Sequence, residues 1–275
     1  MNGHVLEFRW PARIGQILLL LIYGVPMFWL VTTSFKTTSE VFGGLSTFVA
    51  FTPSMAAYQR IWNADLLRSG MNSGLIAAGT TLVTLGLGVP AAYALARLRG
   101  GIVSFGLALI IVLQMLPQTA ALIPLYKVFG SFNLLGSIPG VILADTALLL
   151  PFCTLLLRPF FLAIPIEIEE AATVDGASAW RTFAQIALPL ALNGTATAGT
   201  IIFLISWGEF LYAISFLVDP LQYPLSVLIA SQIGMYGNNW PALMSIAVAA
   251  GLPILVIFLV TYRNLREGLA LGSIR

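Results

Sequence analysis

Apolar residues are gathered along the chain into six long runs, which more polar segments separate from one another. A helix needs about 20 predominantly apolar residues to cross the hydrocarbon core of a bilayer. Six windows meet this length and predict six transmembrane helices, over residues 14–34, 72–96, 102–124, 138–158, 193–218 and 241–262. Four prolines lie inside or near the ends of these windows: Pro26, Pro90, Pro151 and Pro253. Membrane helices accept such kinks when neighbouring groups satisfy the freed backbone.

The composition agrees with this pattern. Of the 275 residues, 59% are hydrophobic and only 9% are charged, and the mean hydropathy is +0.94. Soluble globular proteins carry roughly 25% charged residues. So few charges cannot cover a water-facing surface, and we expect an all-α polytopic membrane protein with one domain over residues 1–275. The run 14–34 differs from a signal peptide, because it is long, contains Pro26 and lacks a small-residue cleavage pattern.

Basic residues predict the orientation, because cytoplasmic loops carry an excess of Lys and Arg. An even number of spans places both termini on one side. If that side is cytoplasmic, the inner segments hold nine basic residues: Arg9, Arg13, Arg97, Arg99, Arg158, Arg181, Arg263, Arg266 and Arg275. The outer segments then hold the other four: Lys36, Arg60, Arg68 and Lys127. We therefore expect a multi-pass protein of the cytoplasmic (inner) membrane with both termini inside.

The chain offers little material for catalysis or metal binding. Its one histidine, His4, lies in the N-terminal tail, which excludes Ser-His dyads and His-based metal motifs. Neither Lys36 nor Lys127 follows the glycine pattern of a phosphate-binding loop. Its one cysteine, Cys153, excludes an internal disulfide. The net charge of +2 is too small to indicate a nucleic-acid partner. We expect no catalytic residue, metal or cofactor on this chain.

The largest polar insertion on the predicted cytoplasmic face is the loop over residues 159–192. Pro165 is well placed to begin a helix, and the glutamates that follow complement the positive end of its dipole. Gly176 permits the left-handed conformation that often ends a helix. Residues 164–177 therefore predict a short helix of about two turns. Such a helix must bury one side, either against its own bundle or against a cytoplasmic partner.

One motif lies in this loop. Glu170-Ala171-Ala172 is followed after three residues by Gly176, and after nine more by Ile186-Ala187-Leu188-Pro189. This spacing resembles the EAA loop of importer permeases from the ATP-binding-cassette (ABC) superfamily. Asp175-Gly176-Ala177 also matches the fuller form of the carbohydrate-importer branch, in which the chain is most similar to the smaller partner of the maltose-type permease pair. Other segments resemble that branch as well, among them Asn72-Ser73, Ala92–Arg97, Ile123–Tyr126 and Trp207–Tyr212.

The resemblance implies a type I importer permease fold with a cytoplasmic coupling helix. It also implies partners: a second permease subunit in a heterodimer, two ATP-binding subunits that bind ATP and Mg, and an extracytoplasmic solute-binding protein. This chain would then be a non-catalytic subunit of a transport ATPase complex. The residues expected to couple it to the ATPase are Glu170, Ala171, Ala172, Asp175 and Gly176. The alternative is that the loop only caps its own bundle.

Two acidic residues lie within the predicted spans, Asp145 and Glu209. A charge at membrane depth costs at least about 2.5 kcal/mol on insertion scales, so it usually faces a cavity or a partner. Glu209 is close in sequence to Trp207 and Tyr212. A carboxylate beside aromatic rings suits a sugar, whose hydroxyls donate to the acid while its C–H faces stack on the rings. These four residues are the candidate substrate pathway, and the alternative for Glu209 is a hydrogen bond between the two permeases.

Together these features predict a subunit that translocates a sugar, of one or several units, by alternating access driven by separate ATPase subunits. Import of a polyol, a glycerol phosphate or an amino acid stays open, because the EAA loop indicates coupling and leaves the cargo open. An ion-coupled secondary transporter is the other alternative. Such transporters typically show internal repeats and broken helices, and the chain has no convincing repeat.

Overall fold

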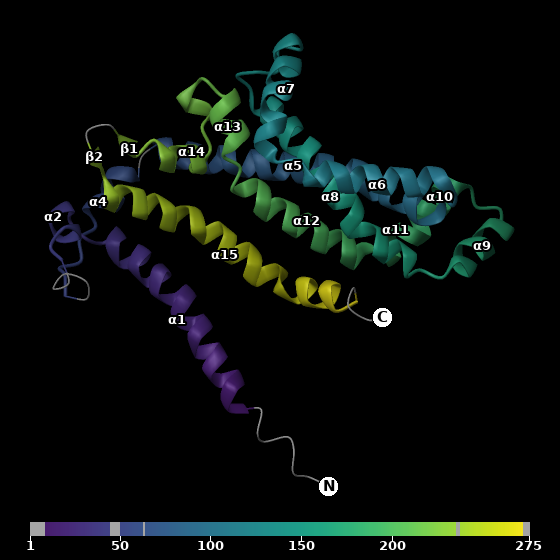
Figure 1. Cartoon of the computed structure of the whole chain (residues 1–275), viewed down its shortest axis with the longest axis horizontal. Helices are drawn as coiled ribbons and strands as arrows, with labels where there is room; N and C mark the ends of the chain where they lie inside the picture. Colours follow the sequence, from purple (N-terminus) through teal and green to yellow (C-terminus); the bar gives the residue numbers. More distant parts are fainter. Residues whose placement is uncertain (1–8, 45–49, 63, 235–236, 272–275) are drawn as a thin grey trace, which may run out of the picture. The chain divides into compact units, whose positions relative to one another are not determined.

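The computed structural model describes residues 9–44, 50–62, 64–234 and 237–271 (Figure 1). Most of these residues are helical, as predicted, and the strands among them form one antiparallel ribbon of β1 (Ile233–Gly234) and β2 (Gly237–Asn238). The chain divides into two compact units, residues 1–67 with 228–252 and residues 68–227 with 253–275. A single domain stays a prediction. The termini themselves, residues 1–8 and 272–275, lie outside the described residues.

The first unit contains α1 (Arg9–Ser34), α2 (Thr38–Val41), α4 (Ala56–Ile61) and the first part of α15 (Trp240–Leu271). A capping box begins α2: the Thr37 side chain accepts from the Glu40 N–H, and the Glu40 carboxylate accepts from the Thr37 N–H at 2.9 Å. The Tyr58 hydroxyl lies 2.8 Å from the Ser34 hydroxyl, which joins α4 to the end of α1.

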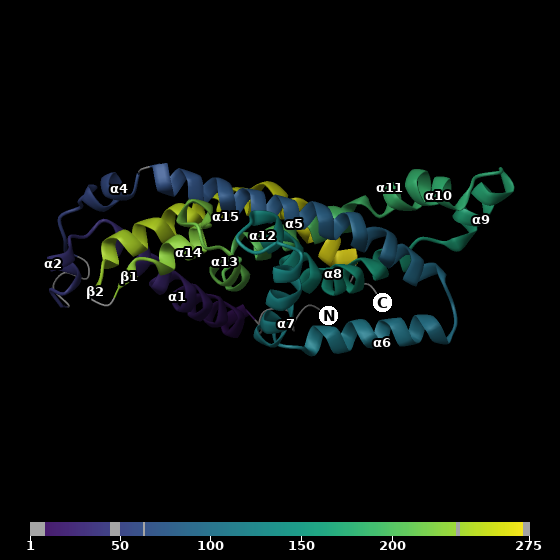
Figure 2. The same cartoon turned by 90° about the horizontal axis from the view of Figure 1, so that it is seen from above.

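The second unit holds most of the remaining elements, and the helix α5 begins just before it. In chain order they are α5 (Ala64–Arg97), α6 (Gly101–Met115), α7 (Gln118–Ser131), α8 (Ile138–Leu162), α9 (Ile166–Val174), α10 (Ala179–Thr182), the π-helix η1 (Phe183–Ala187), α11 (Leu188–Leu190), α12 (Leu192–Trp207), α13 (Leu211–Phe216), η2 (Pro220–Gln222) and α14 (Leu225–Ala230). Figure 1 and Figure 2 both place α9 and α10 at the end of this unit where α5 and α8 finish.

Four helices are long and apolar enough to cross a membrane unbroken: Arg13–Ser34, Asp65–Arg97, Ile138–Leu162 and Trp240–Thr261. Two bent pairs bring the number among the described residues to six if each pair is one span. The first pair is α6 with α7, bent by 100°, and the second is the segment Ala179–Leu190 with α12, bent by 74°. The predicted second span was too short at its start, since α5 begins at Ala64 and not at residue 72.

The third predicted span, 102–124, is wrong as a continuous helix. The helix α6 ends at Met115 and α7 begins at Gln118, and α7 turns away from the line of α6 in Figure 1. Pro117 lacks an N–H to donate and disfavours a helical conformation at the residue before it. Leu116 accordingly has an extended backbone, with φ −71° and ψ 128°. Pro124, in contrast, lies inside α7 without ending it.

The fifth predicted span, 193–218, is also interrupted. The helix α12 ends at Trp207, and α13 resumes at Leu211. In an unbroken helix the Tyr212 N–H would donate to the carbonyl four residues earlier. Here it donates instead to the Glu209 carboxylate, at 2.6 Å. A side chain therefore satisfies a backbone donor at the break.

The core of the second unit is built from close helix contacts between α5, α8 and α12. Small residues at the contacts allow this approach, as is usual between membrane helices. A Cβ added at Gly194 of α12 would overlap the ring of Phe160 in α8, and one at Gly199 would lie 3.0 Å from Leu85 of α5. Between α5 and α8, a Cβ at Gly88 would lie 2.7 Å from the Cys153 sulfur, and that cysteine is fully buried.

Replacing Gly88 with Ala is expected to lower the free energy of unfolding by about 1–3 kcal/mol, because the new methyl overpacks the α5–α8 contact. Gly86 is the matched control: it lies two residues away in the same helix, and a Cβ there meets nothing within 4 Å. Thermal unfolding of the isolated chain in detergent measures both. Cys153→Ala in the Gly88→Ala background should recover most of the loss, and equal losses at Gly86 and Gly88 would contradict the packing described.

Candidate functional site

The helix α9 has the start and the end that its sequence predicts. Pro165 is its N-cap, and Glu167 and Glu169 lie in its first turn. At the other end Gly176 has φ +84°, and its N–H donates to the Thr173 carbonyl at 3.0 Å. The Ala177 N–H donates to the Ala172 carbonyl at 2.9 Å. These two bonds form a Schellman motif, which satisfies the last carbonyls of a helix and requires a left-handed residue.

The predicted coupling residues do not all share one face of this helix. Glu170, Ala171, Asp175 and Gly176 are exposed, whereas Ala172 is only 9% exposed and is turned toward the chain's own bundle. The loop therefore has one buried side and one exposed side. The sequence left two alternatives open, packing on the bundle and contact with a partner. The buried side agrees with the first, and contact of the exposed side with a partner stays a prediction.

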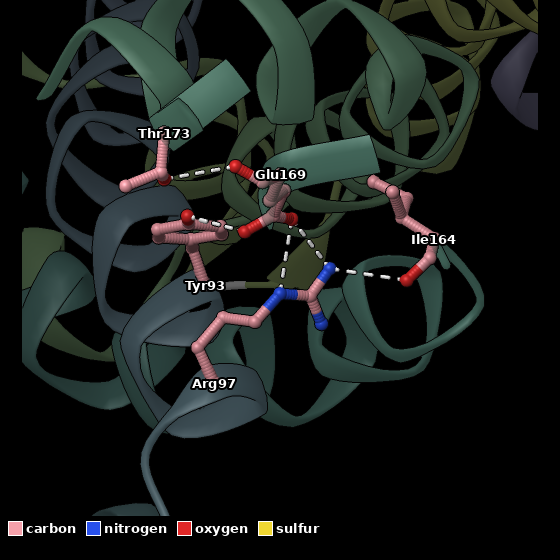
Figure 3. A network of polar contacts seen from close by, with 5 residues as sticks. All are labelled: Tyr93, Arg97, Ile164, Glu169 and Thr173. Atoms are coloured by element: carbon pink, nitrogen blue, oxygen red, sulfur yellow. Dashed lines mark hydrogen bonds and ion pairs between the residues drawn. The ribbon is translucent and has the colours of Figure 1, made fainter. Parts of the chain in front are cut away.

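The buried side carries a residue that the motif did not indicate. Glu169 is 7% exposed, and both of its carboxylate oxygens accept hydrogen bonds from α5 (Figure 3). Arg97 donates to Oε1 through Nε at 2.9 Å and through Nη2 at 2.6 Å. The Tyr93 hydroxyl donates to Oε2 at 2.7 Å. Arg97 Nη2 also donates to the Ile164 carbonyl at 3.2 Å, just before α9.

The charge state of Glu169 follows from these contacts. Burial acts to raise the pKa of this carboxyl, but the hydrogen bonds from Arg97 and Tyr93 and the Arg97 charge outweigh burial. The pKa of Glu169 is therefore held below its ordinary value of 4.5. The carboxylate is charged at neutral pH, and α9 is tied to α5 by an ion pair that is largely shielded from water.

Two exposed apolar side chains, one in the last turn of α9 and one in α10, were also missed from the sequence. Val174 is 88% exposed and Trp180, in α10, is 72% exposed. Exposed apolar side chains close together on a polar loop are typical of a contact surface for another protein. We call Glu170, Ala171, Val174, Asp175 and Trp180 the docking face, after the role that is proposed for them below.

The four candidate pathway residues lie in the second unit, with different surroundings. Asp145, on α8, is 1% exposed, and its Oδ2 has no hydrogen-bond partner among the described residues. Glu209 accepts from the Tyr212 N–H and, at 3.4 Å, from the Gln118 side-chain amide of α7. Trp207 stacks on Phe203 with ring centroids 6.0 Å apart. Glu209 thus has hydrogen-bond partners within its own chain.

A cavity of about 440 Å³ lies against this region. Its lining comes from α6, α7, α8 and α13, and includes Gln118, Leu148, Pro151 and Tyr212. Most of the lining is apolar, with Gln118 and Tyr212 as its polar side chains. Glu209 is joined to this lining by the hydrogen bond that it accepts from Gln118.

The described residues form long apolar helices and two bent helix pairs, together with a short acidic helix that an ion pair ties to the end of α5. These features are typical of a polytopic membrane transport subunit. Residues 85–269 match the family described as the inner membrane component of binding-protein-dependent transport systems. The chain belongs to this family, which comprises the non-catalytic transmembrane permease subunits of ABC transporters. It is therefore a multi-pass inner-membrane protein, and the ion-coupled secondary transporter is excluded.

Relatives match along almost the whole chain. The sulfoquinovosyl glycerol transport system permease protein SmoH of Agrobacterium fabrum is 33% identical, over 96% of this chain and 94% of that protein. The trehalose transport system permease protein SugB of Mycobacterium tuberculosis is 32% identical, over 91% and 92%. The fold is similar to that of a chain in the crystal structure of a bacterial ABC transporter involved in alginate import, with a TM-score of 0.79 and 20% identity over 96% of this chain and 99% of that one. The type I importer fold predicted from the sequence is confirmed.

The ion pair predicts how stability depends on pH. Because the folded pKa of Glu169 is lowered, its contribution is fully present above 4.5 and is lost as the pH falls through the folded pKa. The difference in Tm between wild type and Glu169→Gln should therefore stay constant from neutral pH down to about 5 and shrink in more acidic buffer. Glu167→Gln, on the exposed side of the same helix, is the control and should give no such difference. A difference that grows in acid would contradict the assignment.

Glu209 gives a second prediction. Glu209→Ala removes the acceptor of the Tyr212 N–H and should lower the free energy of unfolding by about 1–2 kcal/mol, as for loss of a helix cap. Glu209→Gln keeps a carbonyl acceptor and should retain most of the stability. Thermal unfolding in detergent compares the two. If Glu209→Gln lowers the stability as much as Glu209→Ala, the negative charge of Glu209 is what stabilises the fold and the capping role is wrong.

Proposed function

We propose that this chain is one transmembrane subunit of an ABC importer that moves a sugar across the cytoplasmic membrane by alternating access. The proposal rests on α9, a short helix with defined caps at both ends. One of its sides is held to the bundle, and the docking face is exposed. The family membership supports the importer class. The relatives named for sulfoquinovosyl glycerol and trehalose transport support a sugar-like cargo, with a polyol, a glycerol phosphate or an amino acid as the alternatives.

The energy comes from partner subunits in this proposal. Two ATPase subunits bind ATP and Mg, and one of them receives the docking face. Glu170 and Asp175 provide negative charges for basic residues of that subunit, while Val174 and Trp180 provide apolar contact area. A second, different permease completes the membrane channel, and an extracytoplasmic binding protein delivers the cargo. Both termini and α9 lie on the cytoplasmic side.

The motion is a switch between inward-open and outward-open states. ATPase closure biases this equilibrium because the ATPase binds the two states with different affinity. The cavity bordered by Gln118 and Tyr212, where Gln118 is hydrogen-bonded to Glu209, is the part of this chain best placed to meet the cargo. Its apolar lining suits the C–H faces of a sugar, and its two polar side chains suit hydroxyl groups.

Val174→Asp is the direct test of docking. The side chain is 88% exposed, so the substitution should leave the fold intact while it adds a charge to the apolar part of the docking face. We expect at least about a tenfold weaker association with the ATPase subunit, in line with a loss of about 1.4 kcal/mol or more. The measurement is the amount of ATPase subunit that co-purifies with the tagged permease pair.

Val218→Asp is the matched control. It is the same substitution at a similarly exposed position, 81%, after the last turn of α13 and far along the chain from the docking face. It should leave co-purification unchanged. If both variants retain the ATPase subunit equally, Val174 does not dock, and if wild type retains none, the importer proposal itself fails.

A further inference from the structure

The helix α5 is held at both ends by contacts with segments that are distant in the sequence. It runs unbroken from Ala64 to Arg97, 34 residues, or about 50 Å at 1.5 Å per residue. One end lies at α9, through Tyr93 and Arg97. Toward the other end, about two turns from the start of the helix, Asn72 and Ser73 contact the segment 219–225 that follows α13.

The contacts at the α9 end are numerous and shielded. Arg97 donates hydrogen bonds to Glu169 through two nitrogens and to the Ile164 carbonyl through one of them. It therefore holds both α9 and the residue that precedes the N-cap of α9 (Figure 3). Such bidentate charged pairs fix orientation as well as distance. The two side chains are only 15% and 9% exposed, so water screens their attraction weakly.

Aromatic contacts strengthen the same end of α5. The Tyr93 ring packs edge-on against Phe161 of α8, with centroids 5.5 Å apart, and against Phe183 of η1 at 5.0 Å. Arg158 of α8 donates to the Leu95 carbonyl at 3.1 Å. The end of α5 therefore contacts elements on both sides of the coupling helix in the sequence.

The contacts at the opposite end are hydrogen bonds to backbone. The Asn72 side-chain amide donates to the carbonyls of Leu221, at 2.9 Å, and Tyr223, at 3.2 Å. The Leu225 N–H donates to the Ser73 hydroxyl at 2.9 Å. Asn72 and Ser73 are 7% and 1% exposed. Unpaired polar groups at such sites are costly, so the segment is held closely to α5.

The covalent route from α9 to the rest of the second unit is less direct. After α9 the chain passes through the turn at Gly176, the short α10, the π-helix η1 and the 74° bend before α12. A π-turn and a sharp bend both interrupt the regular hydrogen-bond ladder of an α-helix. A push on α9 is therefore passed on more faithfully by the shielded contacts with α5 than by the chain that follows α9.

We propose that α5 transmits movement of the coupling helix through the bundle to the segment 219–225, with Glu169, Arg97 and Tyr93 as positioning residues at one end and Asn72 and Ser73 at the other. This proposal rests on the proposed function, because the ATPase supplies the push. The two adjacent glutamates have different roles, since Glu170 faces the motor and Glu169 fastens the helix that the motor moves.

The test uses the assembled importer in lipid nanodiscs, with ATP and vanadate to trap the closed ATPase. Hydrogen exchange at residues 219–226 reports the far end of α5 without any need to know the cargo. In wild type the exchange there should change when nucleotide is trapped. In Glu169→Gln and Arg97→Gln the ATPase subunits should still co-purify, but hydrogen exchange at residues 219–226 should no longer change when nucleotide is trapped. Glu167→Gln and Arg99→Gln, exposed neighbours with the same changes in charge, should behave as wild type.

Replacing the ion pair with a covalent link tests whether the connection between α5 and α9 matters in itself, or only through its effect on the stability of the fold. In a Cys153→Ala background, Arg97→Cys with Glu169→Cys should lose the nucleotide response while reduced and regain it after treatment with a short bifunctional thiol cross-linker. Three results would each overturn the proposal. The wild type could show no nucleotide-dependent change in hydrogen exchange, Glu169→Gln could show the full change, or the cross-linked protein could fail to regain it. Absence of the ATPase subunits from the wild-type preparation would instead refute the proposed function.

Discussion

The hydrocarbon core of the membrane cannot hydrogen-bond a peptide group, and every departure from regular helix in this chain must meet that constraint. The interruption between α12 and α13 meets it with Glu209, whose carboxylate accepts the N–H of Tyr212. The interruption between α6 and α7 meets part of it with Pro117, which brings no N–H to satisfy. An acidic side chain and a proline both look unfavourable in an apolar segment. Here Glu209 permits the interruption after α12, and Pro117 permits the one after α6.

The same constraint explains what could be predicted from the sequence. Length and apolarity are sufficient to locate a membrane helix, so the helices α1, α8 and α15 agree with the predicted windows at their starts to within a few residues. The breaks were missed because they depend on local competition. Pro117 ends a helix, whereas Pro90 and Pro124 are accommodated inside one. Which outcome prevails depends on neighbouring helices, and these are not visible in a window of about 20 residues.

The helix α9 shows a similar division between local and distant signals. Its beginning at Pro165 and its end at Gly176 are local signals, and both were predicted. The ion pair between Arg97 and Glu169 joins positions 72 residues apart, and no spacing rule relates them. Sequence similarity did indicate the segment Ala92–Arg97, but without assigning it a role. Adjacent glutamates at 169 and 170 point about 100° apart on a helix, so only the fold shows which one is buried.

The separate roles of Glu169 and Glu170 constrain how such a loop can diverge. One residue deleted before α9 would bring Glu170 to the anchored position and Ala171 to the exposed one, and one inserted residue would bring Ile168 to the anchored position. The loop therefore tolerates replacement of residues far better than a change in length. Substitutions on the exposed side leave the anchor untouched. In the proposed function, recognition of a different motor subunit needs changes on the exposed side alone, and α9 moved into another bundle needs an arginine and a tyrosine there to match Arg97 and Tyr93.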